Sequence, residues 1–240
     1  MASARAPVPY RTRHDFIMAF MANVMKTSAT TVTGRQRGSR GTRPGKPNAG
    51  MSGHELATQT ASNMRAVARL IASVTDPSSE ASSWTVKQFV SNAIRWIHEG
   101  VPNAEQLKCL RSHETNHSYG CPPEEVQERW NEFMCELQTK IEDDDVDLER
   151  LCAWVEYEIR FTLHPLADGS GRLATALVAW IMLREGRFIP NYSFVQRDEM
   201  HCKLRKGYEV FEKYYLDVCF REEVNGDEDS ADPFDESAAA

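Results

Sequence analysis

The sequence predicts an all-α fold. Apolar residues recur at helical spacing along most of the chain, capping signals precede several of these stretches, and no strand-like alternation of convincing length occurs. With 240 residues, 41% hydrophobic and 26% charged, the chain suffices for one ordinary domain plus terminal segments. The longest apolar-rich stretch, Leu173–Leu183, is shorter than the roughly 18 residues that a membrane helix needs. The sequence therefore predicts no membrane partner.

Several predicted helices begin at recognisable signals. Ser52 with Glu55 forms a capping-box pattern, Pro122 and Pro123 open another helix, and Asp147 caps the next. The expected helices span about 52–71, 84–99, 103–110, 122–141, 147–163, 171–185 and 198–219. The helix 171–185 is apolar nearly all round, which predicts the buried centre of a bundle. Only the stretch Thr115–Cys121 could pair as a short hairpin.

Charge divides the chain into three parts. Residues 1–50 carry nine Lys and Arg against one acid, whereas residues 221–240 carry one Arg against eight acids. The predicted organisation is a basic, partly disordered arm over 1–50, a helical domain over 51–220 and an acidic tail over 221–240. The arm also fits a targeting or secretion segment. Because the middle of the chain is acidic, we expect no specific nucleic-acid partner.

The cysteines predict the compartment. The six cysteines are scattered, none forms a C-x-x-C pair, and no clear signal-peptide cleavage site follows the apolar run near the N-terminus. Free thiols favour a reducing compartment. We therefore predict a cytoplasmic location, unless the basic arm directs the chain elsewhere.

The candidate chemistry lies in the break between the two most apolar helices. This segment reads His-Pro-Leu-Ala-Asp-Gly-Ser-Gly-Arg over residues 164–172. A loop of small residues that enters a buried helix presents unpaired backbone N–H groups at a positive dipole end, which favours phosphate. Arg172 could hold the same anion, Asp168 could carry Mg²⁺, and His164 could accept a proton.

These nine residues resemble the signature of the Fic (Fido) family, written roughly H-x-F-x-D/E-G-N-G-R-x-x-R. The resemblance extends over about residues 84–220. It implies a Fic-like helical bundle with a short flap before the Pro122-Pro123 helix. It also implies a transferase that moves AMP or a related phosphate-bearing group from a nucleotide donor, ATP foremost, to a hydroxyl of a protein acceptor.

The resemblance also assigns roles within the loop. His164 would be the catalytic base, and Asp168 would bind Mg²⁺ or Mn²⁺. Amides around Gly169, Ser170 and Gly171 would form the anion hole, with Arg172 pairing to a phosphate. Leu166 replaces the family's aromatic anchor, and residues 115–121 occupy the position of the target-positioning flap.

This sequence departs from the family signature in three ways. Ser170 replaces an asparagine, and Thr175 replaces a second arginine. The inhibitory helix motif has no clear match, so an inhibitory partner protein could supply it. The first two departures leave two outcomes: either the donor is not a simple nucleoside triphosphate in the family's usual pose, or Ser170→Asn with Thr175→Arg tightens ATP binding.

The sequence leaves two alternatives to a transferase open. Within the fold, a degenerate Fic-like module would bind a ligand without transferring a group. From another class, His113, Glu114 and His117 match H-E-x-x-H, in which two histidines hold zinc and a glutamate activates water. Cys109 and Cys121 continue the four-residue spacing at both ends, so a structural zinc site is also conceivable. The following glycine and prolines oppose the firm helix that the protease motif requires.

Overall fold

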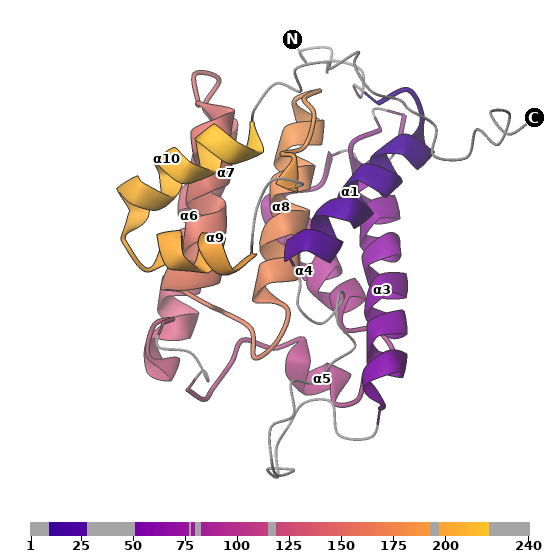
Figure 1. Ribbon diagram of the computed structural model, residues 1–240, viewed down its shortest axis with the longest axis vertical. Helices are drawn as coiled ribbons and strands as arrows, with labels where there is room; N and C mark the ends of the chain where they lie inside the picture. Colours follow the sequence, from indigo (N-terminus) through magenta and orange to yellow (C-terminus); the bar gives the residue numbers. More distant parts are fainter. Residues whose placement is uncertain are drawn as a thin grey trace, which may run out of the picture.

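In the computed structural model, a single buried helix forms the centre of a helical bundle (Figure 1). This helix is α8 (Ser170–Arg184), and α1 (Arg13–Thr27), α3 (Gly53–Val74), α4 (Val86–Ile97) and α7 (Leu148–Tyr157) pack against it. The structure describes residues 10–27, 51–76, 78–79, 83–114, 119–192 and 197–220.

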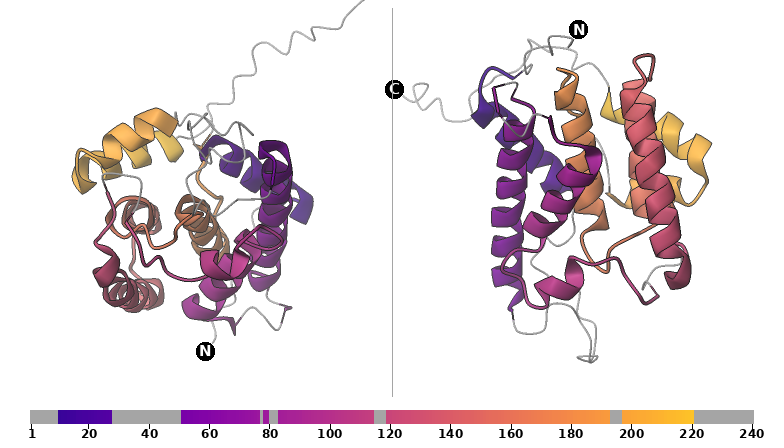
Figure 2. Two further views of the ribbon diagram at one scale, coloured as in Figure 1. Left: turned by 90° about the horizontal axis from the view of Figure 1, so that it is seen from below. Right: turned by 180° about the vertical axis from the view of Figure 1, so that it is seen from behind.

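The remaining helices extend the bundle on the α7 side. A single 3₁₀ turn, η2 (Pro123–Glu125), leads into α6 (Val126–Glu142), whereas α9 (Arg197–Leu204) and α10 (Tyr208–Cys219) follow α8. Figure 2 shows α8 between the α1–α3 side and the α6–α7 side. The short helix α5 (Ala104–Leu107) lies near the end of the bundle at which α8 begins (Figure 1).

Stacked aromatic pairs join the layers of the bundle. Phe89 of α4 stacks on Trp180 of α8 with ring centroids 4.8 Å apart, and Phe133 of α6 stacks on Trp154 of α7 at 5.1 Å. Offset aromatic stacking adds to the stabilisation that apolar burial already gives. The first pair therefore holds α8 against α4, and the second holds α6 against α7.

The all-α prediction is confirmed. Ser52 and Glu55 form the expected reciprocal capping box, and Asp147 caps α7 by accepting from the N–H groups of Glu149 and Arg150. Within the described ranges, extended pairing is limited to one antiparallel bridge between Leu110 and Leu166. Most of the stretch Thr115–Cys121, where a hairpin was predicted, lies outside the described residues. No helix in the described part of the chain is long and apolar enough to cross a bilayer.

Helix α1 belongs to the core, although it lies N-terminal to the predicted domain boundary at residue 51. Phe16, Phe20 and Val24, spaced four residues apart, are at most 1% exposed. Asn23 also donates to the carbonyl of Pro190 at 2.7 Å. Residues 16–25 carry no charged side chain, but the basic residues over 35–46 give the segment 1–50 as a whole the composition of a disordered arm. Residues 28–50 and 221–240 lie outside the described residues.

Two helix predictions need correction. The single helix predicted over 198–219 is instead α9 and α10, separated at Gly207, whose φ of +102° ends the regular helix. The helix predicted to run to residue 163 ends in a wide π-helical turn, η3 (Glu158–Thr162), in which the N–H of Leu163 donates to the carbonyl of Glu158. Such turns are rare in proteins, and those that occur often lie at functional sites.

Candidate active site

The candidate loop joins η3 to the start of α8. Gly169 occupies the cap position with φ +93°, and a Cβ there would lie 3.0 Å from Nε2 of His98. Gly171 is equally constrained, because a Cβ would lie 2.5 Å from Nη1 of Arg160. Close approach of side chains beneath the loop therefore requires both glycines, and the positive φ requires glycine at position 169 as well.

The first turn of α8 offers donors to an anion. No side chain caps this helix, and in an α-helix the amides of Ser170, Gly171 and Arg172 have no acceptor within the helix. The hydroxyl of Ser170 does not face outward, since it accepts from the N–H of Leu166 at 3.1 Å and approaches the Leu166 carbonyl at 3.3 Å. Ser170 can thus contribute its amide, while its side chain stabilises the loop.

Asp168 and Arg172 form an ion pair across one helical turn. Their Oδ2 and Nη2 atoms lie 2.6 Å apart, with the Asp168 side chain 30% exposed and the Arg172 side chain 4% exposed. Burial opposes ionisation of Asp168, but Arg172, followed by His98 and the Gly169 N–H, outweighs it and lowers the pKa of the carboxyl. A ligand that binds Oδ2 of Asp168 or the same N–H of Arg172 must rearrange this pair.

The residues present fit a bound divalent cation only together with a donor. Among the described residues no group of three His, Cys, Asp or Glu side chains could hold a metal ion. Mg²⁺ commonly takes one carboxylate and completes its shell with waters and substrate phosphates. The partly exposed Asp168 carboxylate is consistent with that mode of binding.

His164 adopts an uncommon backbone conformation at the start of the loop. Its φ of +45° lies in the left-handed region, which costs a non-glycine residue roughly 1–2 kcal/mol. The ring Nδ1 lies 3.2 Å from the Arg160 carbonyl, and the ring packs edge-on against Tyr119 at 5.6 Å. If Nδ1 donates to that carbonyl, the lone pair of the neutral ring is on Nε2, the form that a general base needs.

His98 supports the loop from below, which sequence reasoning did not assign. It is 1% exposed, and its Nε2 lies 3.0 Å from the Asp168 carbonyl while Nδ1 lies 3.0 Å from the Ile94 carbonyl. Burial, and next the Arg172 charge, lower the pKa of His98. A neutral imidazole donates through only one nitrogen, so one of these two contacts is not a hydrogen bond while the ring is neutral.

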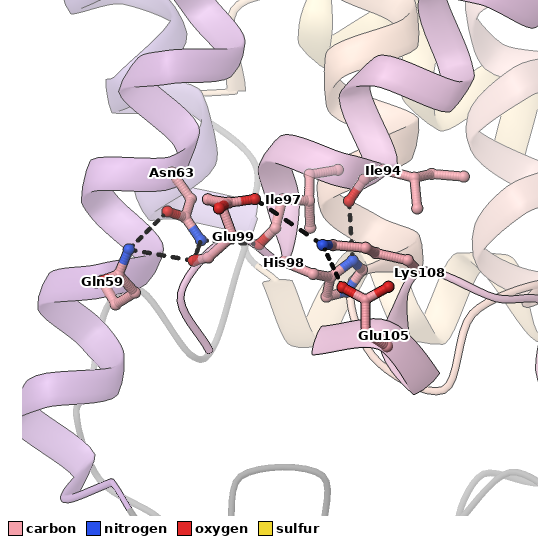
Figure 3. Close-up of polar contacts among 8 residues, drawn as sticks. All are labelled: Gln59, Asn63, Ile94, Ile97, His98, Glu99, Glu105 and Lys108. Atoms are coloured by element: carbon pink, nitrogen blue, oxygen red, sulfur yellow. Dashed lines mark hydrogen bonds and ion pairs between the residues drawn. The ribbon is translucent and has the colours of Figure 1, made fainter. Parts of the chain in front are cut away.

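The turn that carries His98 is anchored to α3 (Figure 3). Asn63 donates to the carbonyls of Ile97 and Glu99 at 3.2 and 2.7 Å, and Gln59 holds the Asn63 amide in place at 2.9 Å. Buried side-chain amides that satisfy several carbonyls fix the end of a helix firmly. The position of the Asp168 peptide is therefore linked through His98 to α3.

A buried ion pair lies beneath the first turns of α8. Arg160 pairs with Glu156, and its Nη2 donates to the hydroxyl of Thr175 at 2.8 Å. Tyr192 donates to the other Glu156 oxygen at 2.6 Å and lies 2.8 Å from the hydroxyl of Tyr215. Burial and the nearby Glu156 raise the pKa of Tyr192 well above its usual value. The network is internally satisfied, as buried charges require.

Comparison with known proteins identifies the fold. No protein-family model matches the sequence, and a search of curated proteins finds no match. Seventeen chains of solved structures do match, one of them a segment of Fic-1 from C. elegans. That structure superposes with a TM-score of 0.60 over 87% of this chain. This chain has a Fic-like fold.

The likeness concerns the fold alone. The sequences are 20% identical, and the match covers 61% of the Fic-1 chain. Within this Fic-like fold, the loop 164–172 enters the central helix α8 as the sequence predicted. The roles of His164, Asp168, Gly169, Ser170, Gly171 and Arg172 remain predictions.

The described part of the H-E-x-x-H segment does not support a zinc site. His113 and Glu114 are exposed and non-helical, whereas the protease motif requires both histidines on one helix. His117 lies outside the described residues. Cys121 is buried, and its thiol donates to the Leu163 carbonyl at 3.6 Å, whereas Cys109 is exposed.

A groove of about 610 Å³ lies between α4 and α6. Val90, Ile94 and Trp130 contribute apolar surface, and none of the residues 164–172 lines it. The groove is consequently separate from the candidate active site.

Proposed function

We propose that this Fic-like chain is a transferase that moves AMP or a related phosphate-bearing group from a nucleotide-type donor to a hydroxyl of a protein acceptor. The observation that carries the proposal is the loop 164–172 at the uncapped N-terminus of the buried helix α8. An uncapped helix start with a neighbouring arginine suits a phosphate group.

The chain's own residues divide the work as follows. The amides of Ser170 and Gly171 bind a donor phosphate, joined by the amide of Gly169 once its N–H leaves the Asp168 carboxyl. Arg172 pairs with the same phosphate after separating from Asp168. Mg²⁺ or Mn²⁺ held between Asp168 and the donor would neutralise phosphate charge. Donor binding thus exchanges one ion pair for several charge-assisted contacts.

His164 performs the proton transfer. Its Nδ1 remains directed at the Arg160 carbonyl, and Nε2 takes the proton from the acceptor hydroxyl. With ATP as donor, the hydroxyl oxygen then bonds to the α-phosphorus while the bond to pyrophosphate breaks. The helix dipole and Arg172 stabilise the charge that develops on the phosphate oxygens.

A binding module without transfer is the second candidate. The contacts that favour it are the ion pair of Asp168 with Arg172 and the inward-facing hydroxyl of Ser170, since both satisfy the loop without a ligand. A missing second arginine at Thr175 points in the same direction, because donor phosphates then have one cation fewer.

The deciding experiment incubates the protein with labelled ATP, UTP, CDP-linked and sugar-linked donors, with Mg²⁺ or Mn²⁺, and reads intact mass afterwards. A mass gain on this chain or on an added protein acceptor, absent in His164→Ala, supports the transferase. Donor binding by calorimetry without any mass gain supports the binding module. If neither binding nor mass gain occurs with any donor, both proposals fail.

A further inference from the structure

Arg111 is a buried arginine that contacts backbone carbonyls. It is 4% exposed, and it makes no ion pair with a carboxylate of the described residues. Nε donates to the His164 carbonyl at 2.7 Å, Nη1 to the His113 carbonyl at 3.1 Å, and Nη2 to the carbonyls of Leu163, at 3.1 Å, and Cys121. Four of the five N–H groups of the guanidinium are thereby engaged.

These acceptors explain why a charge is stable at this position. Leu163 and His164 directly follow the α7–η3 helix, whose last carbonyls have no partner within the helix. A cation at the negative end of a helix dipole is favourable, and the flat guanidinium fork reaches several carbonyls at once. Arg111 therefore caps this helix and replaces the missing helical donors.

The same guanidinium joins three points of the chain. Its partners at residues 113 and 121 are the two ends of the segment before η2, and its partner His164 begins the candidate loop. The backbone strengthens the link, because the Arg111 N–H donates to the Pro165 carbonyl at 2.9 Å and Leu110 bridges to Leu166. The strained φ of His164 is thus held by a hydrogen bond to its own carbonyl.

We propose that Arg111 is a positioning residue that holds the backbones of His164, His113 and Cys121 as one unit, so that the base is fixed relative to residues 113–114 and 119–121. This deepens the proposed transferase and rests on it for the role of His164. Donor binding should be independent of Arg111, because none of its contacts lies in residues 168–172.

The test compares Arg111→Met with Arg111→Lys and with Arg129→Met. Methionine keeps an apolar stem without donors, and lysine keeps the charge without the fork. Arg129 is a matched control, since it lies on the helix after the same segment but is half-exposed and, among the described residues, forms its ion pair with Glu125 at 2.8 Å. Amide hydrogen exchange, the Kd for the donor and kcat toward a protein acceptor are measured for each.

In Arg111→Met we expect exchange to rise about tenfold or more in residues 112–114, 119–121 and 163–166 together, with α3 and α8 unchanged. We expect kcat to fall about tenfold to a hundredfold, because small displacements of a base are costly, and donor Kd to change less than twofold. Arg111→Lys should lie between wild type and Arg111→Met. Arg129→Met should match wild type in all three measurements.

Exchange that rises in only one of the two segments, or equally across α3 and α8, would overturn the proposal. An unchanged kcat in a variant with raised exchange would overturn it as well. If Arg111→Met does not fold, Arg111→Lys provides the same comparison, because it retains the stem and the charge. Should wild type transfer no group, the proposed function fails, while the paired rise in exchange still tests the coupling through Arg111.

Discussion

Arg160 donates a hydrogen bond of 2.8 Å to Thr175, the residue that stands at the position of the second arginine of the signature. In the sequence, Thr175 in place of this arginine means one cation fewer at the candidate site. The structure instead places a guanidinium from the preceding helix next to this site, but Glu156 pairs with it and both are buried. The nearby charge is consequently neutralised within the core.

We therefore expect Thr175→Arg to destabilise the protein rather than restore donor binding. Thr175 is 2% exposed, so a second guanidinium would lie beside Arg160 without a partner of its own. An uncompensated buried charge costs about 3–5 kcal/mol. Urea unfolding would measure this loss, with Thr139→Arg on the exposed side of α6 as the control, for which about 0.5 kcal/mol or less is expected. A stable Thr175→Arg variant with tighter ATP binding would contradict the prediction.

His164→Ala should abolish transfer and leave the fold intact. Loss of a general base typically costs about 10²–10⁴ in rate, and His164 is only half-buried in a loop. His113→Ala is the matched control, because it removes an exposed histidine from the rival zinc motif. Rates of mass gain on an acceptor would separate the two variants. Equal loss in both, or loss only in His113→Ala, would refute the assignment of His164 as the base.

Donor binding should depend on divalent cations through Asp168. A carboxylate beside donor phosphates repels them unless a cation lies between. We expect a chelator to weaken nucleotide binding to wild type about tenfold or more, but to leave Asp168→Asn unchanged within about twofold. Calorimetric titration with and without chelator provides the measurement, and Asp144→Asn in an exposed turn serves as the control. If the chelator left the nucleotide affinity of the wild type unchanged, a role of Asp168 in metal binding would be excluded.

The buried His98 should make stability depend on pH. Because its pKa is lowered in the folded state, the unfolded chain binds more protons as the pH falls below the ordinary value of 6.5. The free energy of unfolding should accordingly decrease as the pH drops through that range, and the slope should flatten in His98→Gln. Denaturant unfolding at several pH values between 5 and 8 would measure the slope, with exposed His54→Gln as the control. An identical slope in wild type and His98→Gln would disprove this explanation.

Gly171→Ala should lower stability although alanine is the better helix former. In an exposed helix this change stabilises by up to about 1 kcal/mol. Here the new Cβ would lie 2.5 Å from Nη1 of Arg160, which Glu156 and Thr175 hold in place. We expect a net loss of about 1–3 kcal/mol by thermal unfolding. A rise in Tm would show that Arg160 moves aside at little cost.

Local signals accounted for much of the fold and for the position of the loop. Caps at Ser52 and Asp147 and the uniformly apolar α8 are properties of short stretches, so the sequence could predict them. The break at Gly207 was missed because apolar spacing continues across it. Helix α1 was missed because the basic residues over 35–46 dominate the composition of residues 1–50, although residues 16–25 carry no charged side chain.

The supporting side chains could not be predicted in the same way. Arg111 and His98 act on carbonyls 53 and 70 residues away, and no local pattern encodes such contacts. The sequence did contain a signal for Arg160. Glu156 and Arg160, an acidic and a basic residue four positions apart, interrupt the buried face of α7 and η3. A charged pair within an apolar stripe indicates a buried polar network.

The wide turn η3 makes the number of residues before the loop as important as their identity. In a regular α-helix the carbonyl of Arg160 would accept from the backbone N–H of His164, whereas here the ring of His164 approaches it. A deletion of one residue between 158 and 162 would favour the regular pattern and would take this acceptor from the ring, with every letter of the loop retained. Among related chains, helix length would then distinguish an active member from an inactive one whose signature looks complete.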